Sequence, residues 1–299
     1  MIRVSFRPTM LLALLASLLL ISTPSVRAQD CDDPKPLRLA LIPKKSPESL
    51  ASDYQPLIQL LEKNLERPVV LLPAPSYGTV IEALLAGRAD LAELGPAAYA
   101  MARKRGADIV AFASFAQNSG PHTPSGSYYH ALLITRQDRA FKKPKDLRGT
   151  TLSLTDPAST SGALIPSQVF AQSLGMPLQG FFRRVSYAGS HDRAIVAVQR
   201  RQVDAAFVSS SRLDEALRKG SIAPGEIAVL WKSSPIPYDP FVHRGRLCAP
   251  LAARIRQVFL NEESALQEMF RTLQMTGFVS VNDEHYREIR QLYDNQSER

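Results

Sequence analysis

The sequence predicts an α/β protein built from two lobes, with a hinged cleft between them. Apolar strand-like runs alternate with helix-like segments from Leu37 to Phe115, and the alternation begins again after Thr150. Such alternation is typical of a parallel sheet covered by helices. The 299 residues give each lobe enough chain to bury a core of its own. Because ligands of open α/β sheets bind at the carboxyl ends of the strands, two facing lobes predict a binding cleft that closes by a hinge.

The elements of the first lobe follow from local pattern. Leu37–Ile42 is an apolar strand that Pro43 ends, and leucines three and four positions apart predict a helix over Leu50–Leu65. Gly87 is expected to end a helix that starts at Tyr77. The remaining segments of this lobe are strands at 68–72, 89–92 and 109–115, a helix at 96–105, and a Ser-, Pro- and Gly-rich loop at 117–126.

The second lobe is expected where the chain crosses over near Thr135, and the chain returns near Lys232. The segment boundaries are a signal peptide at 1–28, lobe 1 at 29–134, lobe 2 at 135–231, and a return to lobe 1 with C-terminal helices at 232–299. The predicted strands are 128–134, 150–154, 181–185, 205–208 and 227–231, and the predicted helices are 161–174, 192–200, 212–218, 250–273 and 283–293.

The first 28 residues predict a secretory signal peptide. Arg3 and Arg7 precede the apolar run Met10–Ile21, and small residues lead to a cleavage point after Ala28. The run is too short to cross a hydrocarbon core of about 30 Å comfortably. We therefore expect a periplasmic protein; an uncleaved anchor and a lipidated Cys31 are the alternatives.

Charge and cysteine content exclude several classes of protein. Loss of Arg3, Arg7 and Arg27 takes the formal net charge from +8 to +5, and no arginine-rich block follows, so no nucleic-acid partner is expected. A mildly positive field favours an anionic solute or an anionic membrane surface. Two cysteines, Cys31 and Cys248, are too few for a four-thiolate zinc site, and neither a metal nor a cofactor is expected. They form either one disulfide or two free thiols.

The segment Thr155–Gly162 carries the clearest chemical signal. Ser159, Thr160 and Ser161 stand between a predicted strand and a predicted helix. Hydroxyl groups, free backbone N–H groups and the helix dipole make such a junction suited to an oxyanion. The spacing is not that of a P-loop. The alternative is simple N-capping by Ser159 or Thr160.

Two further junctions and one aspartate are candidates. His191 follows a predicted strand and is placed to donate to an anion, with Ser190 as a possible cap. Tyr77 begins a predicted helix, and Asp204 begins a predicted strand. For each of them an ordinary packing or surface role is the alternative.

No catalytic signature is present. The G-x-S-x-G and H-E-x-x-H patterns are absent from the sequence. Ser159, His191 and Asp204 contain the groups of a triad, but their spacing does not fix a triad geometry. We expect a protein that is not an enzyme, with a serine hydrolase as a distant alternative.

Several segments together resemble one known family. They are Pro73–Gly78, Asp156–Gly162, Gly189–Asp192, Gln202–Asp204, and Trp231–Pro237 followed by Asp239 and Pro240. In this order they resemble the phosphate/phosphite/phosphonate-binding proteins of ABC importers, the PhnD-like family, over about residues 37–260. The resemblance implies the type II periplasmic-binding fold, a small phosphorus oxyanion as ligand and an ABC permease as membrane partner. Presentation of the ligand to a membrane sensor kinase is the alternative.

The resemblance also implies the residues of the site. Ser159, Thr160 and Ser161 would hold the phosphonate oxygens, and Tyr77 and His191 would contact the same group. Asp192 and Asp204 would face the remainder of an aminophosphonate. Tyr128, on the strand that passes the cleft, is a further candidate.

One position departs from the family pattern. Where some members carry a tyrosine in a W-Y-G-N segment, this chain has Leu94, which cannot donate a hydrogen bond. The departure leaves room for an anion other than phosphonate, or for a different substituent. Lys44 and Lys45, after the first strand, either supply charge at the rim of the cleft or form an exposed loop pair.

Overall fold

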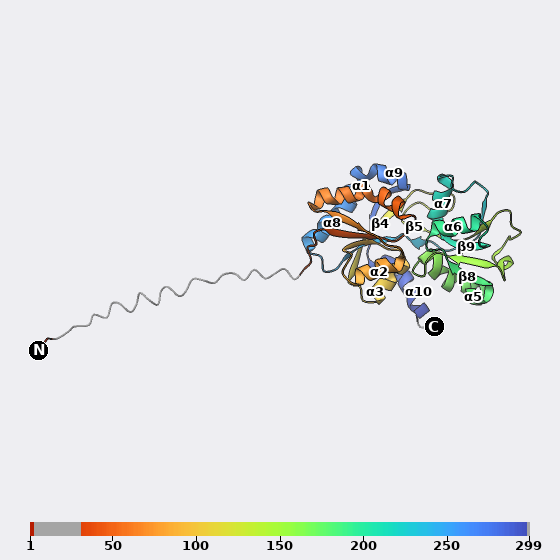
Figure 1. Cartoon of the computed structure of the whole chain (residues 1–299), viewed down its shortest axis with the longest axis horizontal. Coiled ribbons are helices and arrows are strands. Elements are labelled where there is room, and N and C mark those ends of the chain that lie inside the picture. The colour runs from red at the N-terminus through yellow and green to blue at the C-terminus, as the bar shows by residue number, and fades with distance from the viewer. Residues whose placement is uncertain (3–30, 298–299) are drawn as a thin grey trace.

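The computed structural model describes residues 1–2 and 31–297. Its two lobes lie side by side in the view of Figure 1. The expected signal peptide and its cleavage point fall outside the described residues. Within the described chain, no helix has both the length and the apolar character needed to span a membrane.

The first lobe contains a six-stranded sheet in the order β13-β4-β12-β3-β1-β2. Strand β1 pairs in parallel with β2 and β3, whereas β12 and β13 pair antiparallel to their neighbours. The strands are β1 Leu37–Leu41, β2 Val69–Leu72, β3 Leu91–Glu93, β4 Ile109–Gln117, β12 Pro240–Arg244 and β13 Met275–Ser280.

Helices cover both faces of this sheet. The set α1, α8 and α9 packs on one face, and α2, α3 and α10 pack on the other, as Figure 1 shows. Their bounds are α1 Pro47–Leu65, α2 Tyr77–Leu85, α3 Pro96–Lys104, α8 Ala249–Asn261, α9 Gln267–Leu273 and α10 Arg287–Ser297, with 3₁₀ turns at Glu263–Leu266 and Asp283–Tyr286.

The second lobe contains a five-stranded sheet in the order β10-β6-β9-β7-β8. Its strands are β6 Ala131–Arg136, β7 Thr151–Leu154, β8 Arg184–Tyr187, β9 Ala205–Ser209 and β10 Ile227–Lys232. Its helices are α4 Ala171–Leu174, α5 Leu178–Phe181, α6 His191–Gln199 and α7 Ser210–Arg218, with helical turns η1 Pro144–Leu147, η2 Thr160–Leu164 and η3 Pro166–Phe170.

Two short antiparallel strands, β5 Tyr128–Tyr129 and β11 Ile236–Pro237, form a separate two-stranded sheet at the crossings. The strand predicted over residues 128–134 is therefore two strands, of which β6 belongs to the second sheet. The first crossing accordingly precedes Thr135. The return crossing follows the end of β10 at Lys232.

Further predicted elements differ from the structure. The strand predicted over 181–185 is β8, Arg184–Tyr187, and Phe181 ends α5, while the helix predicted over 250–273 is divided into α8, a 3₁₀ turn and α9. The C-terminal region was expected to be helical only, yet β13 lies between α9 and α10 and pairs with β4 at the edge of the sheet. The helix predicted over 161–174 consists of the π-helical turns η2 and η3 followed by α4. Pro166 has no backbone N–H to donate, so regular α-helical bonding is interrupted there.

Cys31 and Cys248 form a disulfide. The bridge joins the first described segment to the start of α8, next to two backbone hydrogen bonds, Asp32 N to Arg246 O at 2.7 Å and Cys248 N to Asp32 O at 2.9 Å. Because 217 residues separate the two cysteines, the bridge closes a large loop of the unfolded chain. The disulfide alternative is therefore correct, and the bridge is a stabilising element of lobe 1.

The double substitution Cys31→Ser, Cys248→Ser is expected to lower the free energy of unfolding by about 2–5 kcal/mol, because the unfolded chain gains conformational freedom. Urea denaturation of the double variant and of the oxidised wild type measures the difference. Ligand affinity is expected to stay unchanged, because neither cysteine lines the interlobe cavity described below. Equal unfolding midpoints would contradict the stabilising role.

Candidate functional site

A cavity of about 430 Å³ lies between the lobes. Lobe 1 contributes the ends of β1 and β3 and the start of α2, while lobe 2 contributes η2 and the starts of α6 and α7. Both crossing segments also reach it. The polar and aromatic residues that line it include Lys44, Lys45, Tyr54, Tyr77, Tyr129, Ser159, Thr160, His191, Arg212, Asp214, Glu215, Arg218, Tyr238 and Asp239.

The three consecutive hydroxyl residues sit at the start of η2 and are buried. Ser159 Oγ accepts from the backbone N–H of Gly162 at 3.1 Å, so this serine is the N-cap. Thr160 Oγ1 accepts from the N–H of Ala97 in the other lobe at 2.9 Å. Ser161 Oγ is buried and has no partner at ordinary hydrogen-bond geometry among the described residues, although it lies close enough to the Tyr129 hydroxyl to affect the pKa of that group. Unlike Ser159 and Thr160, Ser161 does not line the cavity. The capping alternative explains Ser159 alone.

His191 begins α6 and faces the hydroxyl cluster. Its Nδ1 accepts from the backbone N–H of Ser209 at 3.1 Å and lies 3.0 Å from Thr155 Oγ1. Burial, together with the positive charges of Arg212 and Lys44, lowers the pKa of His191 to about 3. The ring is therefore neutral, and its hydrogen lies on Nε2. His191 thus offers the cavity a neutral N–H donor.

Four tyrosines, Tyr54, Tyr77, Tyr129 and Tyr238, line the cavity, and only Tyr77 was predicted. Tyr77 is buried at the first position of α2. Tyr129 is buried, whereas the predicted Tyr128 is 49% exposed and does not line the cavity, because successive residues of a strand face opposite sides. Burial and the charge of Asp239 raise the pKa of Tyr129, and the hydroxyls of Thr160 and Ser161 oppose that shift. Tyr129, not Tyr128, is therefore the strand aromatic of the site.

Asp192 does not line the cavity. It makes a bidentate ion pair with Arg212, whose Nη2 lies 2.7 and 2.9 Å from the two carboxylate oxygens. Arg212 does line the cavity. Asp192 therefore positions a cation of the site, which the sequence analysis did not identify.

The structure does not place Asp204 in the cleft. It precedes β9 and accepts from the N–H and hydroxyl of Thr151 at 2.9 and 2.8 Å, and it pairs with Arg139. Ser209, which contacts His191, lies at the other end of β9. The expectation that Asp204 faces the ligand is corrected, because a strand separates it from the cavity.

The Lys44 side chain is 12% exposed and Lys45 is buried, so the exposed-loop alternative is wrong for both lysines. Lys44 Nζ lies 2.7 Å from Glu93 Oε1 and 3.4 Å from Asp239 Oδ2. Glu93 also accepts from the Tyr54 hydroxyl at 2.6 Å. Burial lowers the pKa of Lys44, but the nearby negative groups outweigh it and hold that pKa well above its usual value. Burial raises the pKa of Asp239 to about 7, with Lys44 opposing the shift and Glu93 adding to it.

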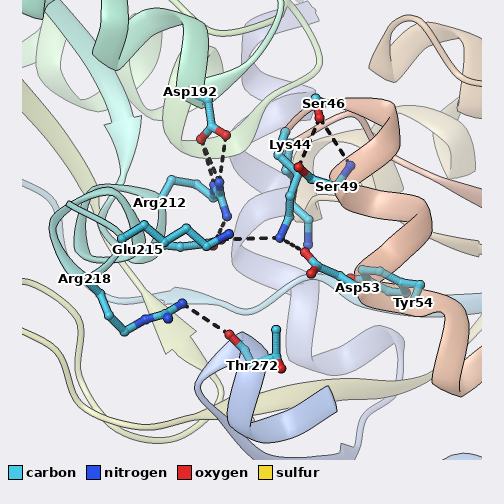
Figure 2. A network of polar contacts seen from close by, with 12 residues as sticks. Lys44, Ser46, Ser49, Asp53, Tyr54, Asp192, Arg212, Glu215, Arg218 and Thr272 are labelled. Carbon is cyan, nitrogen blue, oxygen red and sulfur yellow. Dashed lines mark hydrogen bonds and ion pairs between the residues drawn. The ribbon is translucent and has the colours of Figure 1, made fainter. Parts of the chain in front are cut away.

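A second ionic network joins the lobes across the mouth of the cavity (Figure 2). Lys45, after β1, pairs with Asp53 of α1 and lies 3.5 Å from Glu215 of α7. Glu215 also pairs with Arg212 in its own lobe. Arg218 donates to the backbone carbonyl of Thr272 in lobe 1 at 3.2 Å. Together with the bond from Ala97 to Thr160, these contacts make the structure a closed form.

Leu94 has a structural explanation. It is buried in the core against α2 and α3, its N–H donates to Pro240 O at 3.0 Å, and it does not line the cavity. Tyr77 and Tyr129 do line the cavity. The loss of a tyrosine at position 94 therefore leaves the site with tyrosine donors.

Two α/β lobes closed over a cavity of buried hydroxyl, imidazole and cationic groups define a solute-binding protein. Comparison with known proteins gives the family. Residues 39–286 match the model of the ABC transporter, phosphonate, periplasmic substrate-binding protein family, and the chain belongs to this family. It is therefore a substrate-binding protein of the periplasmic type.

Relatives and solved structures agree with this assignment. The chain is 31% identical to the phosphonates-binding periplasmic protein of Escherichia coli (86% of this chain, 76% of the relative) and 29% identical to the phosphate-import protein PhnD of Mycolicibacterium smegmatis (87% and 86%). A binding protein of an ABC phosphonate transporter from Pseudomonas aeruginosa superposes with a TM-score of 0.76 at 26% identity (87% and 86%). PhnD1 of Prochlorococcus marinus, solved with methylphosphonate, has the same fold with a TM-score of 0.77 at 17% identity (87% and 98%).

Glu215→Gln is expected to shift the unliganded protein towards an open form, because Glu215 contacts cations of both lobes. Burial raises the pKa of Glu215, but Arg212 and Lys45 lower it to about 2, so the carboxylate is charged at neutral pH. Small-angle scattering should show a larger radius of gyration. Glu226→Gln, which affects an ion pair with Arg136 within lobe 2, is the matched control. Identical scattering of Glu215→Gln and the control would contradict the role of Glu215 in holding the lobes closed.

His191→Asn is expected to flatten the pH dependence of stability. The pKa of His191 is about 3 in the folded chain, against about 6.5 when unfolded, so the unfolded state binds more protons between these values. The stability that this histidine contributes is present above pH 6.5 and is lost as the pH falls towards 3. Thermal melting from pH 7 to pH 4 should show a smaller loss in the variant. A steeper loss would contradict a neutral His191.

Proposed function

We propose that this protein captures a small phosphorus oxyanion, namely a phosphonate, phosphite or phosphate, and delivers it to the membrane permease of an ABC importer. The observation that carries the proposal is the set of donors at the start of η2 and α6. Thr160 and His191 line the cavity, His191 presents Nε2–H, and the buried Ser161 hydroxyl follows Thr160 in the chain. Buried donors left unsatisfied are costly, and an oxyanion satisfies several at once.

The charges of the cavity fit the same guest. Four cationic side chains and three carboxylates line it. The names of the relatives point the same way, since one is a phosphonate-binding and the other a phosphate-import protein. Binding across both lobes favours the closed form, and in this family the ligand-bound protein works with a membrane permease.

The alternatives receive no support from the described residues. The triad considered for a hydrolase is not assembled: Ser159 caps Gly162, His191 Nδ1 accepts from Ser209, and Asp204 lies at the far end of β9. Nothing in the described chain favours a sensor kinase over a permease. We also propose that cleavage after Ala28 releases the protein into the periplasm, which N-terminal sequencing of the exported protein tests.

Ser161→Ala is expected to weaken oxyanion binding by about 1–3 kcal/mol, the range for a buried hydrogen bond to a charged group. Thr160→Ala should have an effect of similar size, because it also removes the acceptor of the Ala97 N–H. Calorimetric titration with phosphate, phosphite and methylphosphonate, with sulfate for comparison, measures the affinities.

Ser173→Ala is the matched control, since this hydroxyl donates to Phe170 O outside the cavity. It should bind as the wild type does. Wild-type affinity in both Ser161→Ala and Thr160→Ala would remove the hydroxyl cluster from the site. Failure of the wild type to bind any of these phosphorus oxyanions would overturn the proposed function.

A further inference from the structure

The cavity is larger than a tetrahedral oxyanion requires. Its volume is about 430 Å³, whereas a water molecule takes about 30 Å³ of the liquid. An ion of one phosphorus and a few oxygen atoms fills a small part of it. The residues around the remaining volume therefore decide which substituent on the phosphorus the site accepts.

Lys44 and its two carboxylate partners lie next to the hydroxyl cluster. A Cβ added at Gly95 would be 3.5 Å from Thr160 Oγ1 and 3.9 Å from Asp239 Oδ1. Asp239 is in turn 3.4 Å from Lys44 Nζ. A ligand whose oxygens are held by Thr160 thus has Asp239 and Lys44 within reach of its first substituent atoms.

Both carboxylates of this corner already have a cationic partner within the protein. Lys44 Nζ pairs with both Glu93 and Asp239 and lies 5.8 Å from the centre of the Tyr238 ring. Tyr54 adds a hydrogen bond to the second oxygen of Glu93. Without Lys44, the buried Asp239 in the cavity lining and Glu93 behind Lys44 would lack a cation, and a ligand ammonium could supply it, because buried charges require partners. With Lys44 in place, a ligand ammonium meets a fixed positive charge, and both carboxylates are already paired.

We propose that Lys44 is a specificity-determining residue that acts as a built-in counter-ion, so that the site selects phosphonates with an uncharged substituent and rejects those with an ammonium group. This inference rests on the proposed function and deepens it. It narrows the phosphonates that the cleft accepts to simple alkyl and related neutral compounds.

The test uses two ligands of nearly the same size and shape. n-Propylphosphonate and 2-aminoethylphosphonate differ by the replacement of a terminal methyl with an ammonium group. Calorimetric titration of the wild type at pH 7 is expected to give at least tenfold tighter binding of n-propylphosphonate. Equal affinity, or tighter binding of 2-aminoethylphosphonate, would overturn the inference.

Lys44→Met removes the internal cation while keeping an unbranched side chain. It should raise the affinity for 2-aminoethylphosphonate at least tenfold relative to n-propylphosphonate, because Asp239, which lines the cavity, then lacks its cation and can pair with the ligand ammonium. Lys44→Arg should keep the wild-type preference. Lys104→Met is the matched control, since Lys104 is half-exposed on α3 and pairs with Asp294. An unchanged ratio of affinities in Lys44→Met would contradict the assignment.

The remaining outcomes separate this inference from the proposed function. Binding of phosphate or phosphite with neither organophosphonate would overturn the inference alone, because the cavity would then accept no substituent. Binding of none of these anions would overturn the proposed function. Should Lys44→Met fail to fold, as judged by thermal melting, the wild-type preference and the Lys44→Arg variant still decide the question. Loss of the preference for n-propylphosphonate in Lys44→Arg would show that the size of residue 44, and not its charge, sets the preference, and would contradict the proposal.

Discussion

Closure over a buried, charged guest is the constraint on which the rest of this structure depends. An anion removed from water needs several donors at fixed positions, and each donor needs a scaffold that holds it when the site is empty. Here the donors come from the starts of η2 and α6, at the carboxyl edge of the second sheet. The N–H of Ser209 fixes the tautomer of His191. Glycine is required at position 162, because a Cβ there would lie 2.3 Å from the Thr155 side chain.

Contacts between the lobes serve the same constraint. Ala97 at the start of α3 donates directly to Thr160, so the anion-binding hydroxyls are tied to lobe 1. Lys45 and Glu215 meet at the mouth of the cavity and connect α1 to α7. Because the same side chains line the cavity and bridge the lobes, ligand capture and closure are coupled through shared groups.

The internal ion pairs divide the cavity into two chemically different regions. Around Thr160 and His191 the groups are a hydroxyl and a neutral imidazole. Around Lys44 the groups are an ammonium and the two carboxylates of Glu93 and Asp239. On the proposals above, recognition of the anion and discrimination among its substituents depend on different residues, which lie on different lobes.

Local pattern was enough to predict most of the fold. The alternation of elements, the helix beginning at Tyr77 and the hydroxyl run before a helix all depend on residues close in sequence, and the structure has them. The strand β13 was missed because it depends on its long-range pairing with β4. The π-helical turns η2 and η3 were missed because helical spacing alone does not distinguish them from an α-helix. Ser159 caps the first turn by accepting from the N–H of Gly162, and Pro166 begins the second.

The sequence by itself determined the two-lobed α/β class, the hydroxyl cluster and His191, since these follow from periodicity, junction chemistry and motif order. Only the tertiary structure decided which charged residues belong to the site. Lys44, Arg212 and Tyr129 line the cavity, whereas the predicted Tyr128 does not. Asp204 lies outside the cavity and accepts from Thr151. The physical reason is that burial and pairing of a charge depend on neighbours distant along the chain, which no local spacing specifies.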